Sequence, residues 1–218
     1  MANHLDLEEQ EQLDKLKHFW NQYGNLITWV LIAALAAAAA WNGYQYWQRK
    51  QSTQAAAMFD EVEKVVNAGD VDKADRAFND MKDRFASALY TQQAGLLVAK
   101  MAYEASKPEV AKTTLTWVAD KSSDPGYAAI ARLRLANVHM EARAFDEALK
   151  VLDGIKTAEF EALASDRRGD VYAAQGNSAE AKTHYLKAYK AMDEKSDYRR
   201  LLTYKLNALG VDPEQTNP

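Results

Sequence analysis

Side chains that could carry catalysis or hold a metal are few and scattered in this chain. Its 218 residues include no cysteine, and its four histidines are far apart: His4, His18, His139 and His184. No histidine belongs to an HExxH motif, and neighbouring acids such as Asp146 and Glu147 fit the first turn of a helix, where negative charge is favourable. No glycine-rich phosphate loop or nucleophile elbow is present. We therefore expect no catalytic residue, no metal site and no cofactor.

The composition indicates that helices must position whatever chemistry the chain does carry. Alanine, leucine and charged residues are abundant, only 4 prolines and 9 glycines occur, and runs of β-branched residues are missing. The net charge is −4 and the basic residues are scattered, which argues against a nucleic-acid partner because phosphate binding needs a basic face. We predict an all-α protein.

A near-continuous apolar run over residues 26–47 predicts one N-terminal transmembrane helix. The run has no charged residue, and 22 helical residues span about 33 Å, which matches a hydrocarbon core of about 30 Å. Aromatic side chains that favour the membrane interface lie near its two ends: Trp29, Trp41, Tyr44, Tyr46 and Trp47. We expect membrane lipid around this segment.

Two other interpretations of the apolar run are weaker. A buried helix of a soluble protein rarely runs this long without a polar face. A cleaved signal peptide begins with a short basic segment, whereas residues 1–25 form an acidic tail with two lysines and five acids. The orientation of the span stays open, because Lys15 and Lys17 before it balance Arg49 and Lys50 after it.

Residues 48–210 carry helix-length segments that come in pairs, and the pairs repeat. In the last pair, small and large residues are placed as in a tetratricopeptide repeat: Gly169, Tyr172, Gly176, Ala181, Tyr185 and Ala188. The first glycine lets the second helix approach closely through its own alanine, and the tyrosines fill the gaps on either side. The glycine near the turn permits the chain to reverse. Residues 211–218 are expected to be a disordered tail.

Earlier pairs carry alanines at corresponding positions. Ala148, which accompanies Ala136, precedes Ala181 by 33 residues, and Ala111 and Ala74 lie two further steps of 37 residues toward the N-terminus. The usual period of this repeat is about 34 residues. The sequence therefore predicts a solenoid of TPR-like helical hairpins over residues 48–210, with a generic helical bundle as the alternative.

A stack of such hairpins offers a concave groove, because each hairpin is rotated slightly against its neighbour. The register turns several polar and aromatic side chains of the first helices toward this groove: Gln93, Lys100, Tyr103, Asn137 and Asp170. These side chains could bind an extended or a helical segment of a partner, or they could be ordinary solvated residues. The same register assigns His139 to packing and places His184 on the exposed side of its helix.

The whole arrangement resembles the YfgM-like family of bacterial inner-membrane proteins, described as ancillary subunits of the SecYEG translocon. The resemblance rests on residues at the end of the span and on three stretches of the domain: Trp41, Gly43, Tyr46 and Trp47, and residues 131–136, 148–156 and 166–170. It implies a type II topology, with the acidic tail in the cytoplasm and the repeat domain in the periplasm. It also implies association with the translocon and with PpiD, a membrane-anchored periplasmic chaperone, in handling newly exported proteins.

Two functions follow as hypotheses. In the first, the protein is a non-enzymatic adaptor whose span docks beside the translocon through the small residues Ala36–Ala40, while the groove binds a PpiD-like chaperone or exported client proteins. In the second, it is a structural organiser of the cell envelope that acts by self-association in cell-wall assembly or division. The resemblance implies no catalytic residues for either.

Overall fold

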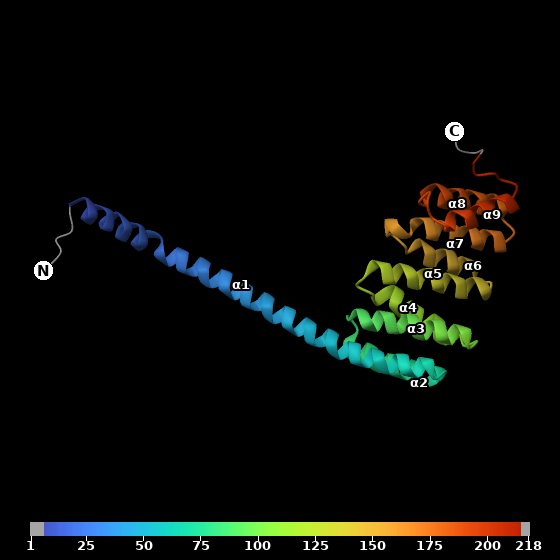
Figure 1. Ribbon diagram of the computed structural model, residues 1–218, viewed down its shortest axis with the longest axis horizontal. Coiled ribbons are helices and arrows are strands. Elements are labelled where there is room, and N and C mark those ends of the chain that lie inside the picture. The colour runs from blue at the N-terminus through green and yellow to red at the C-terminus, as the bar shows by residue number, and fades with distance from the viewer. Residues whose placement is uncertain (1–6, 215–218) are drawn as a thin grey trace. The chain divides into compact units, whose positions relative to one another are not determined.

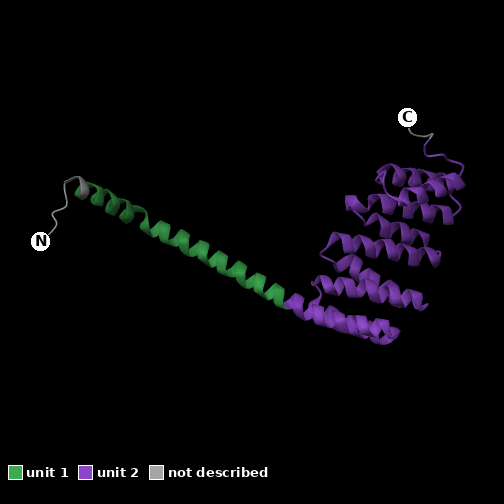
Figure 2. Cartoon of the chain, in the orientation of Figure 1, with its two compact units in different colours: residues 1–50 green, residues 51–218 purple. Residues whose placement is uncertain are grey.

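The computed structural model describes residues 7–214, with side chains from residue 10 onward, and contains helices but no strand in that part of the chain. It divides into two compact units, residues 1–50 and residues 51–218 (Figure 2). The prediction of an all-α protein is confirmed. His4 and the rest of residues 1–6 lie outside the described residues.

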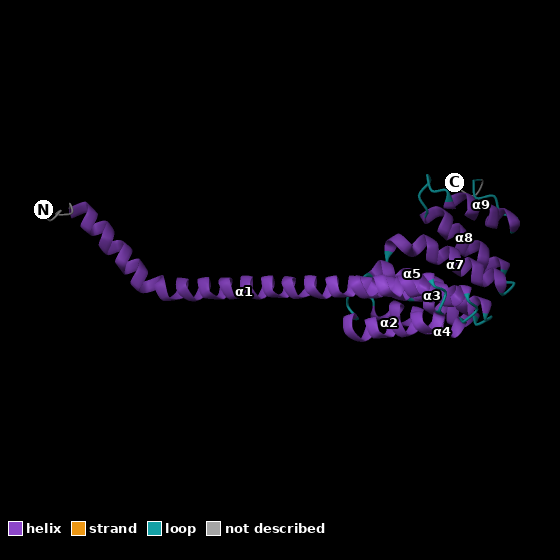
Figure 3. Cartoon of the chain, turned by 60° about the horizontal axis from the view of Figure 1, so that its bottom comes forward, coloured by secondary structure: helices purple, strands orange, loops and turns teal. Residues whose placement is uncertain are grey.

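Unit 1 consists of the N-terminal part of one helix, α1, which extends from Leu7 to Asn67 (Figure 3). Residues 7–25 of the predicted acidic tail are therefore helical. Among the described residues, α1 is the one helix long and apolar enough to cross a membrane. Only 6% of its most apolar 18-residue stretch is buried by the rest of the protein. A core helix of a soluble protein would be mostly covered, so this surface fits immersion in lipid.

The five predicted interface aromatics are all exposed, from 52% for Trp47 to 72% for Tyr46. Tyr44 and Trp47 stack with their ring centroids 6.3 Å apart, and Gln48 Nε2 donates to the Tyr44 hydroxyl at 2.9 Å. The aromatic cluster at the end of the apolar run thus forms an amphipathic belt, apolar in its rings and polar at its hydroxyl groups.

Unit 2 is a stack of helical hairpins followed by one further helix (Figure 1). Its first helix is the part of α1 from residue 51 onward. The other elements of its described residues follow in chain order: α2 (Val71–Phe85), α3 (Leu89–Glu104), α4 (Pro108–Lys121), α5 (Pro125–Glu141), α6 (Phe145–Asp153), the 3-10 helix η1 (Ala158–Phe160), α7 (Glu161–Ala174), α8 (Ser178–Ala191) and α9 (Tyr198–Ala208). α1–α2, α3–α4, α5–α6 and α7–α8 are the hairpins, and α9 packs on the last of them.

Each hairpin turns at one residue in the left-handed region of backbone conformation. These four residues have φ between 57° and 79°: Gly69, Ser106, Arg143 and Gly176. They are 37, 37 and 33 residues apart, the same intervals that separate the predicted alanines. In the second turn, for example, the amide of Lys107 donates to the carbonyl of Ala102 at 2.8 Å. Ser106 and Arg143 adopt this conformation without the freedom that glycine has.

The alanines that define the register are fully buried in all four hairpins: Ala74, Ala111, Ala148 and Ala181. Twelve residues earlier, on the first helix of each hairpin, the corresponding residues are also small or of medium size: Val62, Ala99, Ala136 and Gly169. A Cβ atom at Gly169 would lie 2.5 Å from the ring of Tyr185. The α7–α8 hairpin closes on a glycine because no side chain fits beneath that ring.

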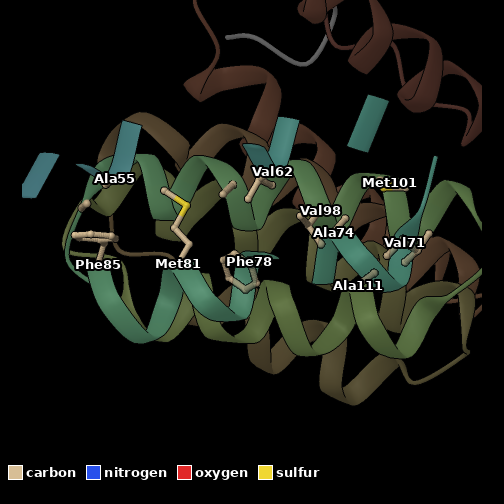
Figure 4. Close-up of a cluster of buried hydrophobic side chains, with 13 residues drawn as sticks. Ala55, Val62, Val71, Ala74, Phe78, Met81, Phe85, Val98, Met101 and Ala111 are labelled. Atoms are coloured by element: carbon tan, nitrogen blue, oxygen red, sulfur yellow. The ribbon is translucent and has the colours of Figure 1, made fainter. Parts of the chain in front are cut away.

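One buried cluster joins α1, α2, α3 and α4 (Figure 4). Ala55 and Val62 of α1 are 0% and 1% exposed and pack in this cluster with Phe78 and Met81 of α2. The ring of Trp117 on α4 meets Phe78 edge-on at 5.5 Å. Since its side chains are covered in this way, the part of α1 after residue 51 is the first helix of the first hairpin rather than a linker.

A cluster of buried and half-buried charges fixes α9 to the last hairpin. Lys205 Nζ of α9 lies 2.7 Å from carboxylate oxygens of both Asp166 and Asp170 on α7. The Tyr198 hydroxyl donates to Asp166 at 2.7 Å and the Tyr185 hydroxyl donates to Asp170 at 2.8 Å. Burial, together with these carboxylates, raises the pKa of both tyrosines, so both remain hydrogen-bond donors.

The position of α9 continues the repeat. Lys205 follows Asp170 by 35 residues, about one repeat, so α9 occupies the place of the first helix of a fifth hairpin. Of the predicted tail 211–218, Val211 donates its amide to the Leu206 carbonyl at 3.0 Å and Pro213 is buried. Residues 215–218 lie outside the described residues.

Candidate partner-binding groove

A pocket of about 320 Å³ lies between α3 and α5, at the lower end of the size range of ligand pockets. Three helices line it: Ala99, Lys100, Tyr103 and Glu104 of α3, Leu115 of α4, and Arg134, Asn137 and Val138 of α5. Ala99, Leu115 and Val138 are buried and give the pocket an apolar floor. We call this site the α3–α5 groove.

The charged side chains of the α3–α5 groove already have partners within the protein. Arg134 Nη1 donates to a backbone carbonyl of α3 at 3.0 Å, and Lys100 Nζ lies 3.7 Å from Glu104. The Tyr103 hydroxyl donates to the carboxylate of Glu141, and this hydrogen bond raises the pKa of Tyr103. Lys100 and Arg134 face one carboxylate of the lining, that of Glu104, and Glu141 beside the pocket supplies a second. Counted together with Glu141, the charges around the groove cancel.

Asn137 differs from its neighbours in the groove. Its side chain is half-buried, and its Oδ1 is buried without a hydrogen-bond partner among the described residues. An unpaired buried acceptor costs about 1–3 kcal/mol. A molecule bound in the groove can reach this acceptor only if the carboxamide turns its oxygen toward the pocket, which the broad terminal torsion of asparagine permits.

The structure brings together three of the five side chains predicted to face a groove, namely Lys100, Tyr103 and Asn137. Gln93 of α3 lies outside this pocket, and its Nε2 donates to the hydroxyl of Tyr127 on α5 at 2.6 Å. Asp170 lies on α7, where its carboxylate is held by the charge cluster of α9. The Asp170 carboxylate is 17% exposed, because α9 covers it.

Sequence reasoning missed Arg134, which lines the α3–α5 groove, and Glu141, which accepts a hydrogen bond from Tyr103 of that groove. Glu141 follows Glu104 by 37 residues, so the repeat interval that relates the alanines also relates these two glutamates. Extending the register to charged positions would have found it. Arg134 carries no such signal, because its partner is a backbone carbonyl of another helix.

Neither His139 nor His184 is among the residues that line the α3–α5 groove. His139 is half-buried, as expected of a packing residue, and burial lowers its pKa. The expectation that His184 is exposed is wrong: it is half-buried and stacks on Tyr172 with ring centroids 5.2 Å apart. Burial also lowers the pKa of His184. Within the part of the chain that is described, no three His, Asp or Glu side chains form a cluster that could hold a metal ion.

Comparison with known proteins relates the chain to one family. The family model described as a tetratricopeptide repeat-like domain matches residues 17–211. A protein of Neisseria gonorrhoeae named ancillary SecYEG translocon subunit is 33% identical over 96% of this chain and 100% of its own length. The chain belongs to the YfgM-like family of tetratricopeptide-repeat-like proteins. The predicted family and the TPR-like fold are thereby confirmed.

Further relatives of the same name are more distant. The protein of Haemophilus influenzae is 26% identical over 93% of this chain and 98% of its own length. The protein of Escherichia coli K12 is 24% identical over 93% of this chain and 97% of its own length. The similarity thus includes the apolar helix as well as the repeat domain.

Proposed function

We propose that this protein is a non-enzymatic, membrane-anchored adaptor of the SecYEG translocon. The apolar part of α1 crosses the inner membrane, and the repeat domain lies in the periplasm. There the α3–α5 groove binds a PpiD-like chaperone or newly exported proteins. The groove carries the proposal, because it joins an apolar floor to Asn137, whose Oδ1 has no hydrogen-bond partner among the described residues.

Three observations support association with the translocon and partner binding by the repeat domain. The relatives that align with nearly the whole chain are named as ancillary subunits of the translocon. The rest of the protein covers very little of the apolar stretch of α1. The small residues Ala36–Ala40 are therefore free to contact other membrane helices closely. The α3–α5 groove is formed by first helices of adjacent hairpins, the surface on which a repeat array binds partners.

Photocrosslinking in cells tests the adaptor function. A photoreactive amino acid is introduced at Ala38 in the span, at Lys100 beside the groove, or at Glu180 as a control on the exposed surface of α8. We expect translocon subunits to be captured from Ala38, and a chaperone or exported chains from Lys100 but not from Glu180. Capture of only further copies of this protein would instead support the envelope organiser.

Cysteine labelling tests the topology, because the chain has no cysteine of its own. Single cysteines replace Glu11 of α1 and Glu194 after α8, whose side chains are 70% and 88% exposed. With a membrane-impermeant maleimide on spheroplasts, we expect Glu194→Cys to be labelled at once and Glu11→Cys only after lysis. The reverse pattern would place the repeat domain in the cytoplasm and refute the proposed orientation.

A further inference from the structure

We infer that the α3–α5 groove binds an extended, unfolded segment of polypeptide and discriminates against helices of folded partners. This inference rests on the proposed function, in which the groove binds a protein, and it specifies the conformation that the groove accepts. The carboxamide of Asn137 above an apolar floor is the feature that carries it.

One polar group of the groove, the side chain of Asn137, is not fully hydrogen-bonded within the described part of the protein. The cationic and acidic groups around it are paired within the protein, as are Tyr103 and Glu141. Asn137 Oδ1 is buried and has no partner among the residues described. The terminal torsion of an asparagine side chain is broad, so the carboxamide can turn either its oxygen or its amino group toward an occupant. The missing partner is therefore a group that offers an N–H, a C=O or both.

A peptide bond offers both groups, but only where the backbone is not already hydrogen-bonded. In the interior of an α-helix, every N–H and C=O is used within the helix. An extended chain leaves these groups free, and its side chains alternate to opposite faces. One peptide unit can then pair with Asn137 while a neighbouring side chain enters the pocket.

The floor and the charge of the groove specify that side chain further. Ala99, Leu115 and Val138 are nearly buried residues of the lining and carry no polar side-chain group, so the floor of the pocket offers the occupant no hydrogen bond. Because the surrounding charges cancel, the groove provides no net attraction for an acidic or a basic segment. The occupant is therefore an apolar stretch of non-helical chain, such as a protein exposes before it folds.

Binding of a permanently unfolded protein tests the inference. The full chain is reconstituted in lipid nanodiscs, and fluorescently labelled α-lactalbumin is added either reduced and carboxymethylated, which keeps it unfolded, or native. Anisotropy titrations are performed with the wild type, with Asn137→Leu, and with Asn207→Leu as a control. Asn207 lies on the exposed surface of α9, so the control makes the same substitution outside the groove.

We expect the unfolded probe to bind and the native probe to bind far more weakly. Asn137→Leu should weaken binding of the unfolded probe about two- to tenfold, the effect of one hydrogen bond, and Asn207→Leu should not. The melting temperature of Asn137→Leu should stay equal or rise, since the substitution removes an unpaired buried acceptor. If Asn137→Leu lost binding because it misfolds, its affinity for the unfolded probe and its melting temperature would fall together.

A second measurement varies the bound peptide. With a photocrosslinker at Lys100, mass spectrometry identifies the probe segment in the groove, which is then synthesised with a single N-methyl group at successive backbone positions. One methylated position should weaken binding to the wild type about as much as Asn137→Leu does, and should add little in that variant. Equal binding of native and unfolded probes would overturn the inference, as would unchanged affinity of Asn137→Leu or of every methylated peptide.

Failure of this inference can be distinguished from failure of the proposed function. If the unfolded probe does not bind but Ala38 still captures translocon subunits in cells, the extended-segment inference is wrong and the adaptor function stands. If Ala38 captures no translocon subunit, the adaptor function is wrong whichever probe the groove binds.

Discussion

Replacing Lys205 with methionine should destabilise the last hairpin much more than the same exchange at Lys187 of α8. The lysine contacts two carboxylates at 2.7 Å, and its side chain is 21% exposed. Asp166 and Asp170 beside it are 1% and 17% exposed. Methionine retains the length of the side chain and removes the charge, which leaves Arg167, 3.1 Å from Asp170, as the remaining cation of the cluster.

The magnitude follows from the burial of these carboxylates. Removing one partner of a buried ion pair costs about 3–5 kcal/mol, because the remaining charge is neither solvated nor neutralised. With a urea dependence of about 2 kcal/mol per molar, the unfolding midpoint should fall by about 2 M. Since repeats are stabilised by their nearest neighbours, α9 should also open locally, and its amide hydrogens should exchange faster than those of α3.

Urea unfolding of the full chain in mild detergent, followed by far-UV circular dichroism, measures this effect. Lys187→Met is the matched control: its ammonium group lies 2.6 Å from Glu161, but the two side chains are 57% and 37% exposed. An exposed pair contributes less than about 1 kcal/mol. Adding Asp166→Asn and Asp170→Asn to Lys205→Met should restore much of the loss. Equal midpoint shifts for Lys205→Met and Lys187→Met would refute the reasoning.

Three further predictions concern the hairpins. Gly169→Ala should lower the free energy of unfolding by about 1–3 kcal/mol in thermal melts, because the new Cβ would lie 2.5 Å from the Tyr185 ring. Gly176→Ala should cost about 1 kcal/mol and Ser106→Gly should gain up to about 1 kcal/mol in chemical unfolding, because both residues have left-handed φ angles. Burial lowers the pKa of His184, so the unfolded chain binds more protons than the folded one as the pH falls. The stabilisation that comes from neutral His184 should therefore be complete above about pH 6.5 and decrease below it. His184→Phe should flatten that part of a curve of stability against pH.

Each of these predictions has its own control. Gly43→Ala adds a Cβ that meets nothing within 4 Å and should leave the melt unchanged, whereas an unchanged melt of Gly169→Ala would contradict the repeat register. Loss of stability in Ser106→Gly would show that this turn is not left-handed. His139, whose pKa is also lowered by burial, accounts for the pH dependence that remains in His184→Phe. A curve unchanged by that substitution would contradict the burial of His184.

The helices and their register could be predicted because their signals are local. Gly69 and Gly176 mark two turns, and the buried alanines recur at intervals that the turns share. The left-handed turns at Ser106 and Arg143 could not be predicted, because neither residue type favours that conformation and the hydrogen bonds of the turn impose it.

The composition of the groove could be predicted only in part. Lys100 and Asn137 are 37 residues apart at one register position, so periodicity alone indicated that they face the same side of adjacent hairpins. The same argument assigned Asp170 to the groove. In the structure, that carboxylate is instead engaged by Lys205 of α9.

The sequence by itself determined that the chain has one apolar helix and a series of helical hairpins with buried small residues, because period and hydrophobicity are properties of neighbouring residues. Only the tertiary structure decided which polar groups are satisfied. Asp166 gains its partners from α9, and Asn137 gains none among the described residues, because pairing depends on side chains that approach from other helices. Distances of this kind have no counterpart in the order of the residues, and the proposed role of the α3–α5 groove rests on them.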